Sequence, residues 1–463
     1  MPTPRRPNVV LLMADDQRFD TIHALGCPAI HTPNLDALAQ CGVAFTQAHI
    51  PGSTHGAVCM PARAMLWSGR SLFHLQNQGA QIPAEHITLG ECFQNAGYQT
   101  IGVGKWHADR AAFARTFSSG DEIFFGGMWD HWNVPAYHFD PTGQYAACLP
   151  MVEDFWYHNT VRQRGCDHVT SGVHSTDLFT NAAIKLLHNR DRSRPFLLSV
   201  AFLAPHDPRT MPESFRSLYD PEKIALPANF APAHTIDTGT LQLRDELLAP
   251  LPRTPADTRR HIAEYYAMIS HLDAAVGRLR ACLEELGEWD NTIFVHMADH
   301  GLAVGQHGLM GKQNLYDHSV RIPLLLSGPG LPRGQVCRQM VYALDVNPTL
   351  CQLAGITPPP TVDGQSLCGV LRGDPGRDRL YLAYCQTIRG IKTARHKLIE
   401  YNAGGQRATQ VFNLEKDPLE TTNLAADESL LATLRRQLLE LRDQYDDLSH
   451  PLGRQFWTSM EFR

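Results

Sequence analysis

Asn8-Val9-Val10-Leu11-Leu12-Met13-Ala14-Asp15-Asp16 is a continuous apolar run that ends in two carboxylates. Much later in the chain, a second apolar run, Thr292–Ala298, ends in Asp299-His300. Apolar residues that are continuous rather than alternating predict strands buried on both faces, as in parallel sheets. Ligands of open α/β sheets bind beyond the carboxyl ends of the strands, so the polar residues after these runs are the first candidates for a functional site.

Three further apolar runs, 100–104, 196–204 and 322–327, predict strands of the same parallel kind. Helical patterns separate the runs, and the longer patterns have apolar residues at three- and four-residue intervals. These patterns cover residues 34–39, 87–96, 176–189 and 259–286. Because strand and helix alternate, we predict an α/β fold with a large, mostly parallel sheet sandwiched by helices.

The chain changes character near residue 374. Pro358-Pro359-Pro360 and Gly373-Asp374-Pro375-Gly376 interrupt the helical patterns, and short strand-like runs follow them. A polar helix is predicted at about 429–445. We therefore expect a catalytic α/β domain over 1–374 and a smaller C-terminal subdomain, an antiparallel sheet plus a helix, over 375–463.

Composition excludes some functions and compartments. The 463 residues carry a formal net charge of −6, without the basic field that grips nucleic acid. The eleven cysteines have no regular spacing, which is typical of free thiols in a reducing compartment. No signal segment and no membrane-spanning stretch is recognisable. We expect a cytoplasmic protein with neither a nucleic-acid nor a membrane partner, and the oligomeric state stays open.

Cys59-Met60-Pro61-Ala62-Arg63 is the candidate reactive motif. Pro61 suits the first turn of a helix, so Cys59 is predicted to lie just before a helix N-terminus. That position favours a negative charge on the side chain and an anion bound nearby, and Arg63 adds fixed positive charge one turn further on. These features indicate a reactive group that faces an anionic substrate. The alternative is a buried cysteine without chemistry.

The other candidates follow the predicted strands. Asp15, Asp16 and Asp299 offer carboxylates, which favour Ca²⁺ or Mg²⁺, and the His300 imidazole widens the choice towards Mn²⁺ or Zn²⁺. Two histidines at separate strand ends could supply an acid and a base near neutral pH. Those histidines and their neighbouring lysine are Lys105, His107 and His206.

Together these motifs resemble the type I sulfatases of the alkaline phosphatase-like superfamily. The resemblance spans nearly the whole chain, and it is carried by the Cys59 motif, Gly104-Lys105-Trp106-His107, Ala204-Pro205-His206-Asp207-Pro208, Ala298-Asp299-His300-Gly301 and Gly311-Lys312. It implies an alkaline phosphatase-like fold and a sulfuric ester hydrolase that cleaves an aryl, other small-molecule or glycan sulfate.

The resemblance also implies a modified nucleophile and a metal. A formylglycine-generating enzyme would oxidise Cys59 to formylglycine, whose hydrate attacks the sulfur and forms a covalent sulfoenzyme. One divalent cation, first Ca²⁺ and otherwise Mn²⁺ or Mg²⁺, would be held by the modified Cys59 together with Asp15, Asp16, Asp299 and His300.

The same resemblance implies roles for the remaining residues. Arg63 would hold the hydrate and the oxyanion on the metal side, and Lys105 and Lys312 would bind the sulfate oxygens. His107 would take the proton from the second hydroxyl of the hydrate. His206 would protonate the leaving alcohol.

Three questions remain open in the sequence. His300 also occurs in relatives that cleave phosphonate monoesters and phosphodiesters, so such a hydrolase is the alternative function. An unconverted relative that only binds anions is a third possibility. Residues 124–157, rich in Trp, Tyr, His and Gly, either form a rim that selects the organic part of the substrate or simply pack as a loop.

Overall fold

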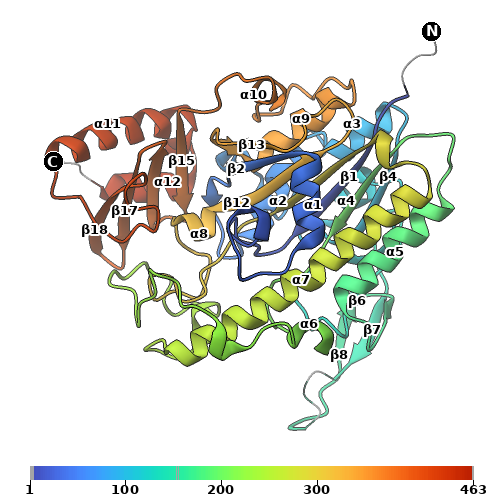
Figure 1. Ribbon diagram of the computed structural model, residues 1–463, viewed down its shortest axis with the longest axis horizontal. Helices are drawn as coiled ribbons and strands as arrows, with labels where there is room; N and C mark the ends of the chain where they lie inside the picture. Colours follow the sequence, from blue (N-terminus) through green and yellow to red (C-terminus); the bar gives the residue numbers. More distant parts are fainter. Residues whose placement is uncertain (1–4, 153, 155, 461–463) are drawn as a thin grey trace.

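A nine-stranded sheet forms the centre of the molecule (Figure 1). The computed structural model describes residues 5–152, 154 and 156–460. The strand order is β13-β2-β12-β11-β1-β10-β4-β5, and β14 also pairs with β2. The strands are β1 (Asn8–Ala14), β2 (Val43–His49), β4 (Gln99–Lys105), β5 (Ser119–Phe124), β10 (Phe196–Ala201), β11 (Thr292–Ala298), β12 (Arg321–Ser327), β13 (Gln335–Cys337) and β14 (Val341–Tyr342).

The register of the central strands brings four carboxyl ends level with one another. β1 lies between β10 and β11, and β4 lies on the far side of β10, all parallel. Ala14 is opposite Ala298, Met13 is opposite Ala201, and Ala201 is opposite Gly104. The residues after these strands therefore meet at one edge of the sheet, as the sequence predicted.

The prediction of a fifth parallel strand at 322–327 is wrong in direction. β12 runs antiparallel to both β11 and β2. Parallel neighbours need a crossover connection, usually a helix, and between β11 and β12 the described chain forms only the short helix α8 (Asp317–Val320). The continuous apolar pattern correctly predicted that this strand is buried on both faces, but such a pattern does not indicate the direction of the strand.

Helices cover the sheet in two packed groups. One group contains α1 (Pro33–Cys41), α5 (Ser175–Asn189) and α7 (Pro255–Glu285), and α5 and α7 run side by side in Figure 1. The other contains α2 (Cys59–Ser68), α3 (Leu89–Asn95) and α9 (Val346–Leu353). Every residue of β1 and β11 is buried, so both faces of the central strands are covered. The predicted sandwiched α/β fold is confirmed.

The C-terminal part has its own sheet, drawn in red in Figure 1. Its antiparallel strands are β15 (Arg379–Tyr384), β16 (Ile388–Thr393), β17 (His396–Ala403) and β18 (Gln406–Asn413), and α11 (Glu428–Gln444) and α12 (Pro451–Ser459) follow them. An unpredicted fifth strand, β3 (Gly52–Ser53), pairs in parallel with β15. The segment before Cys59 is thus part of the C-terminal sheet, and the domain division at 374/375 stays a prediction.

Two small two-stranded antiparallel sheets come from the region between β5 and α5. β6 (Pro135–Ala136) pairs with β9 (His168–Val169), and β7 (Cys148–Met151) pairs with β8 (Arg162–Gly165). All eleven cysteines are free thiols. Within the described ranges, no helix has both the length and the apolar character required to cross a membrane.

Candidate active site

The structure brings all of the residues singled out in the sequence to one edge of the large sheet. Asp15 and Asp16 follow β1, Asp299 and His300 follow β11, Lys105 ends β4 with His107 two residues on, and His206 lies just beyond β10. α2 supplies Cys59 and Arg63, and the loop before α8 supplies Lys312. The parallel register is the reason for this convergence, because it aligns strands that are far apart in the sequence.

Cys59 is the first residue of α2 rather than the residue before it, and only 2% of its surface is exposed. Its Sγ lies 3.2 Å from His107 Nδ1 and 3.4 Å from Lys105 Nζ. Burial alone would raise the pKa of this thiol, but the charges of Lys105 and His107 outweigh burial and hold the pKa well below its ordinary value. The site is therefore electropositive at the predicted nucleophile.

Arg63 connects the cysteine helix to the strand ends. Its Nε donates a hydrogen bond to Asp299 Oδ2 at 2.9 Å, and its Nη1 donates to the Lys105 carbonyl at 3.0 Å. Its Nη2 lies 3.5 Å from Asp15 Oδ2. One guanidinium therefore fixes α2 relative to β1, β4 and β11.

The carboxylates and His300 form a tight cluster. The backbone N–H of Asp16 donates to Asp299 Oδ1 at 3.2 Å, and His300 Nδ1 lies 3.2 Å from Asp16 Oδ1. Lys105 makes an ion pair with Asp15, and Lys312 Nζ donates to Asp16 Oδ1 at 2.8 Å. Burial would raise the pKa of Asp15, but Lys105 and Arg63 outweigh it and keep that pKa well below its usual range.

Two buried atoms indicate that this cluster fits a divalent cation. Asp15 Oδ1 and His300 Nε2 have no hydrogen-bond partner among the described residues. Unpaired buried polar atoms are rare because each is costly, so a pair of them needs an explanation such as an ion. Ligand atoms of Asp15, Cys59, Asp299 and His300 also lie within 4.8 Å of one another. Carboxylate oxygens with one imidazole suit Ca²⁺, Mg²⁺ or Mn²⁺.

The charges of the site are also compatible with a bound divalent cation. The three carboxylates of Asp15, Asp16 and Asp299 face three cations. The cations are Arg63, Lys105 and Lys312, all buried. A divalent cation would add two positive charges to these six groups, which suits an anionic substrate.

His206 is held by neighbours that the sequence did not suggest. Its Nδ1 lies 2.8 Å from the Asp207 carbonyl, its Nε2 lies 3.8 Å from Asp16 Oδ2, and burial lowers its pKa. The buried His131 Nε2 donates to the His206 carbonyl at 3.0 Å. His131 in turn stacks on His174, with ring centroids 4.9 Å apart. The sequence contains 23 histidines, but no local pattern in it indicates this support.

A cavity of about 250 Å³ opens above Cys59. Cys59, His107, His206 and Lys312 line it together with residues from other segments. These residues are Gly127 and Met128 of the 124–157 segment, and Leu243, Arg244 and Asp245. Part of the 124–157 segment therefore does reach the cavity that holds the predicted catalytic residues.

The loop that carries Lys312 is clamped by a glutamate that the sequence did not reveal. Glu246 is 2% exposed and accepts hydrogen bonds from the backbone N–H of Met310 at 2.8 Å and of Gly311 at 2.9 Å. The buried Arg253 Nη2 donates to the same carboxylate at 2.7 Å. No local pattern signals this role, because Met310 and Gly311 lie more than 60 residues from Glu246.

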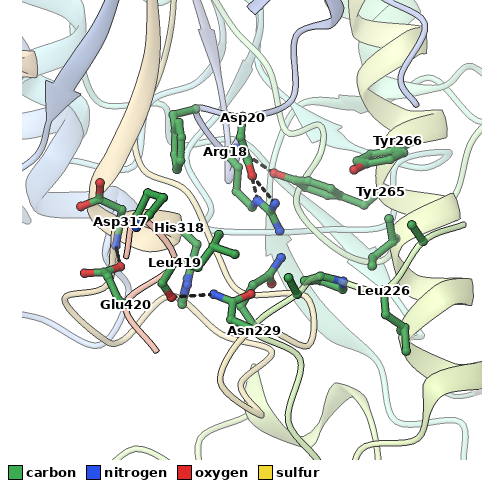
Figure 2. A pocket seen from close by; sticks show the side chains of 17 residues that line it. Arg18, Asp20, Leu226, Asn229, Tyr265, Tyr266, Asp317, His318, Leu419 and Glu420 are labelled. Carbon is green, nitrogen blue, oxygen red and sulfur yellow. Dashed lines mark hydrogen bonds and ion pairs between the residues drawn. The ribbon is translucent and has the colours of Figure 1, made fainter. Parts of the chain in front are cut away.

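A second cavity, also of about 250 Å³, lies next to the loop after β1 (Figure 2). None of the predicted catalytic residues lines it. Figure 2 shows the Arg18 guanidinium bound to Asp20 and the Asn229 side chain bound to the Leu419 carbonyl. Asp317 and Glu420 are paired with buried lysines, so the charges of this cavity already have partners. We therefore take the cavity above Cys59 as the candidate active site.

The chain belongs to the sulfatase family. The family model described as Sulfatase matches residues 7–356, and a model described as N-sulphoglucosamine sulphohydrolase, C-terminal, matches residues 305–444. The first model covers most of the chain and contains every predicted site residue, and the protein is accordingly a sulfatase-type enzyme.

Relatives agree with this assignment. An arylsulfatase from Clostridium perfringens (strain 13 / Type A) is 27% identical over 457 residues, which cover 91% of each chain. A solved structure in complex with its substrate, D-glucosamine-2-N,6-O-disulfate, matches with a TM-score of 0.76 at 22% identity, over 96% of this chain and 99% of that one. The phosphonate monoester hydrolase of Agrobacterium radiobacter matches with a TM-score of 0.74 at 24% identity, over 95% and 96%. At these identities the two structures support the fold alone.

Proposed function

We propose that this enzyme hydrolyses a sulfate monoester, of a small molecule or of a glycan, in the cavity above Cys59. The observation that carries the proposal is the position of the Cys59 sulfur. It faces the cavity, lies within hydrogen-bond distance of Lys105 and His107, and adjoins the carboxylate cluster. A reactive atom among fixed cations suits an ester whose negative charge is spread over several oxygens.

Formylglycine at position 59, made by a formylglycine-generating enzyme, is the proposed nucleophile. The Cys59 Sγ stands in for the oxygens of its hydrate. One hydroxyl of the hydrate would attack the sulfur and hold the sulfate covalently. His107 Nδ1, 3.2 Å from Sγ, is within reach of the second hydroxyl and would remove its proton, so that the aldehyde reforms and sulfate leaves.

Asp15, Asp16, Asp299 and His300, with residue 59, would hold one divalent cation, of which Ca²⁺ suits three carboxylates best. The cation would supply positive charge for a sulfate oxygen. Arg63 lies between Asp299 and Asp15 and would orient the hydrate. The unpaired Asp15 Oδ1 and His300 Nε2 support this ligand set.

Lys105 and Lys312 would bind the sulfate oxygens, and His206 would protonate the leaving alcohol. Lys312 and His206 both line the cavity, and Lys105 Nζ lies 3.4 Å from the Cys59 sulfur. In the present structure the two lysines are bound to carboxylates. With a divalent cation on those carboxylates, the lysines would be available to the substrate.

A phosphonate monoester or phosphodiester hydrolase remains the second candidate. His300 and the fold shared with a phosphonate monoester hydrolase favour it, and tetrahedral sulfur and phosphorus esters can use the same site. The test is kcat/KM of protein co-produced with a formylglycine-generating enzyme on 4-nitrophenyl sulfate, a phenylphosphonate monoester and a bis-aryl phosphodiester. We expect the sulfate to be the best substrate. Faster turnover of either phosphorus ester would refute sulfatase activity as the main function.

Mass spectrometry of the peptide that contains Cys59 tests the nucleophile separately. We expect the formylglycine mass in the active preparation. Activity that does not vary with the converted fraction would exclude formylglycine as the nucleophile.

A further inference from the structure

We propose that a second pocket beside the catalytic cavity binds an anionic group, a carboxylate or a second sulfate, on the sugar next to the one that carries the scissile sulfate. This proposal rests on the sulfate-ester hydrolysis proposed above, and it defines the substrate as a polyanionic glycan. Most of the residues that line the pocket belong to the 124–157 segment, whose role the sequence left open, and Arg110, Arg164 and Gly165 complete it.

The location of the pocket suits an extended substrate. It has a volume of about 340 Å³ and shares Gly127 and Met128 with the catalytic cavity. Gly127 lies directly against His107, because a Cβ at Gly127 would be only 3.0 Å from His107 Cε1. A sugar linked to the one that carries the scissile sulfate can therefore pass over Gly127 into the second pocket. A volume of this size lies within the range of small-molecule sites, ~300–1,000 Å³.

The walls of the pocket are aromatic and basic. Phe124, Phe125 and Trp129 contribute rings, Arg110 and Arg164 contribute guanidinium groups, and the described residues that line the pocket include no acidic one. The Arg164 guanidinium carbon lies 4.0 Å from the centroid of the Trp129 ring, so the two flat groups support each other. Aromatic surface suits the C–H face of a sugar, and guanidinium forks suit carboxylate or sulfate oxygens.

Arg110 is the best-placed group for such an anion. Its Nη1 donates to the Tyr145 carbonyl at 2.8 Å and its Nη2 donates to the Tyr137 hydroxyl at 3.2 Å. The guanidinium also lies over the rings of Phe125 and Tyr137, at 5.6 and 5.3 Å. These contacts fix its direction but supply no counter-charge, and among the described residues no carboxylate pairs with it. A half-buried, oriented and uncompensated guanidinium favours an anion from the ligand.

The test compares substrates that do and do not reach the second pocket. One disaccharide carries the scissile sulfate on one sugar and a carboxylate on the next, a second has that carboxylate as its methyl ester, and a third carries a second sulfate there. 4-Nitrophenyl sulfate is the small reference. The measured quantity is the ratio of kcat/KM for each disaccharide to kcat/KM for 4-nitrophenyl sulfate.

Arg110→Gln should lower this ratio about tenfold or more for the anionic disaccharides, since a hydrogen bond to a charged group is lost. It should change the ratio for the methyl ester far less. Trp129→Ala should lower the ratio several-fold for all three disaccharides. A larger effect on the carboxylate or on the second sulfate identifies which anion the pocket takes, and either supports the proposal.

Trp289→Ala is the matched control. Trp289 is also covered by an arginine, with the Arg280 guanidinium carbon 4.8 Å from its ring, and it also lines a surface hollow. That hollow includes Thr292, at the amino end of β11 and thus away from the catalytic edge. This variant should leave every ratio unchanged.

Two failures are distinguishable. If the wild type hydrolyses 4-nitrophenyl sulfate but neither Arg110→Gln nor Trp129→Ala changes the ratios, the second pocket is not a substrate subsite. Parallel loss on all substrates, with unchanged ratios, would likewise overturn the proposal and assign both residues to folding. If converted wild type hydrolyses no sulfate ester, the proposed function itself fails.

Discussion

Glu246→Ala removes the clamp on the loop that carries Lys312. The wild-type carboxylate accepts hydrogen bonds from the Met310 and Gly311 N–H groups and pairs with the buried Arg253. Without it, the partners left to Arg253 among the described residues are carbonyls, such as that of Gly308 at 3.1 Å, and none of them is a counter-charge for this buried guanidinium. Loss of one partner from a buried ion pair destabilises a fold by about 3–5 kcal/mol, and we expect a loss of this size.

The same change should lower activity, because Lys312 directly follows the two clamped residues. A displacement of about 1 Å at a catalytic group can reduce the rate about 100-fold. We therefore expect kcat/KM on 4-nitrophenyl sulfate to fall by about this factor at a temperature where the variant is folded. Glu246→Gln keeps an acceptor of the same shape and should lie between the variant and the wild type.

The assay pairs denaturant unfolding with steady-state kinetics. Glu284→Ala, which removes an exposed partner of Arg280, is the surface control and should shift stability by less than about 0.5 kcal/mol. Wild-type stability and wild-type kcat/KM in Glu246→Ala would refute the reasoning. Lower stability with unchanged kcat/KM would confine Glu246 to a structural role.

Further predictions concern His107, the carboxylate cluster and the buried histidines His131 and His174. His107→Ala should accumulate a covalently sulfated enzyme, visible by intact mass spectrometry; normal turnover would contradict the assigned role. Asp299→Asn should lose bound metal, measured by elemental analysis, together with activity, and loss of only one of the two would contradict the proposed ligand set. Burial lowers the pKa of His131 to about 4 and of His174 to about 3, against 6.5 in the unfolded chain. Below pH 6.5 the unfolded state therefore binds more protons, and stability should fall by about 1.4 kcal/mol per pH unit for each histidine down to about pH 4. Denaturant unfolding between pH 7 and pH 5 measures this slope, and His131→Gln should flatten it by one histidine's share; an unchanged slope would show that His131 is not buried as a neutral ring.

Much of the large sheet is predictable because its strands are bounded apolar runs. The predicted bounds of β1 and β11 agree with the structure, since polar residues end each run directly. The run 196–204 was predicted three residues too long, because the chain leaves the sheet after Ala201 but stays buried. β2 was missed and β12 was given the wrong direction. The presence of β2 and the direction of β12 depend on pairing with other strands of the sheet, and a local sequence pattern does not indicate such pairing.

The site also contains some residues that a local pattern predicts and others that depend on tertiary contacts. Asp15, Asp299 and Lys105 were found because they end strands, where an α/β sheet binds its ligands. Glu246, Arg253 and His131 were not found, because their roles arise only when loops far apart in the sequence meet. Their chemistry is ordinary in isolation, and only tertiary contacts make them supports of the reactive groups.

The pairing of β3 with β15 has a consequence for the timing of biosynthesis. Gly52 lies opposite Ala383. During synthesis, β3 can therefore pair with β15 only after about 330 further residues have been translated. Until then the region around Cys59 lacks its final neighbours and is open to an external enzyme. In the folded protein the Cys59 thiol is almost fully enclosed. The proposed oxidation of Cys59 therefore belongs to the nascent chain, and a folded molecule that escapes it keeps its thiol.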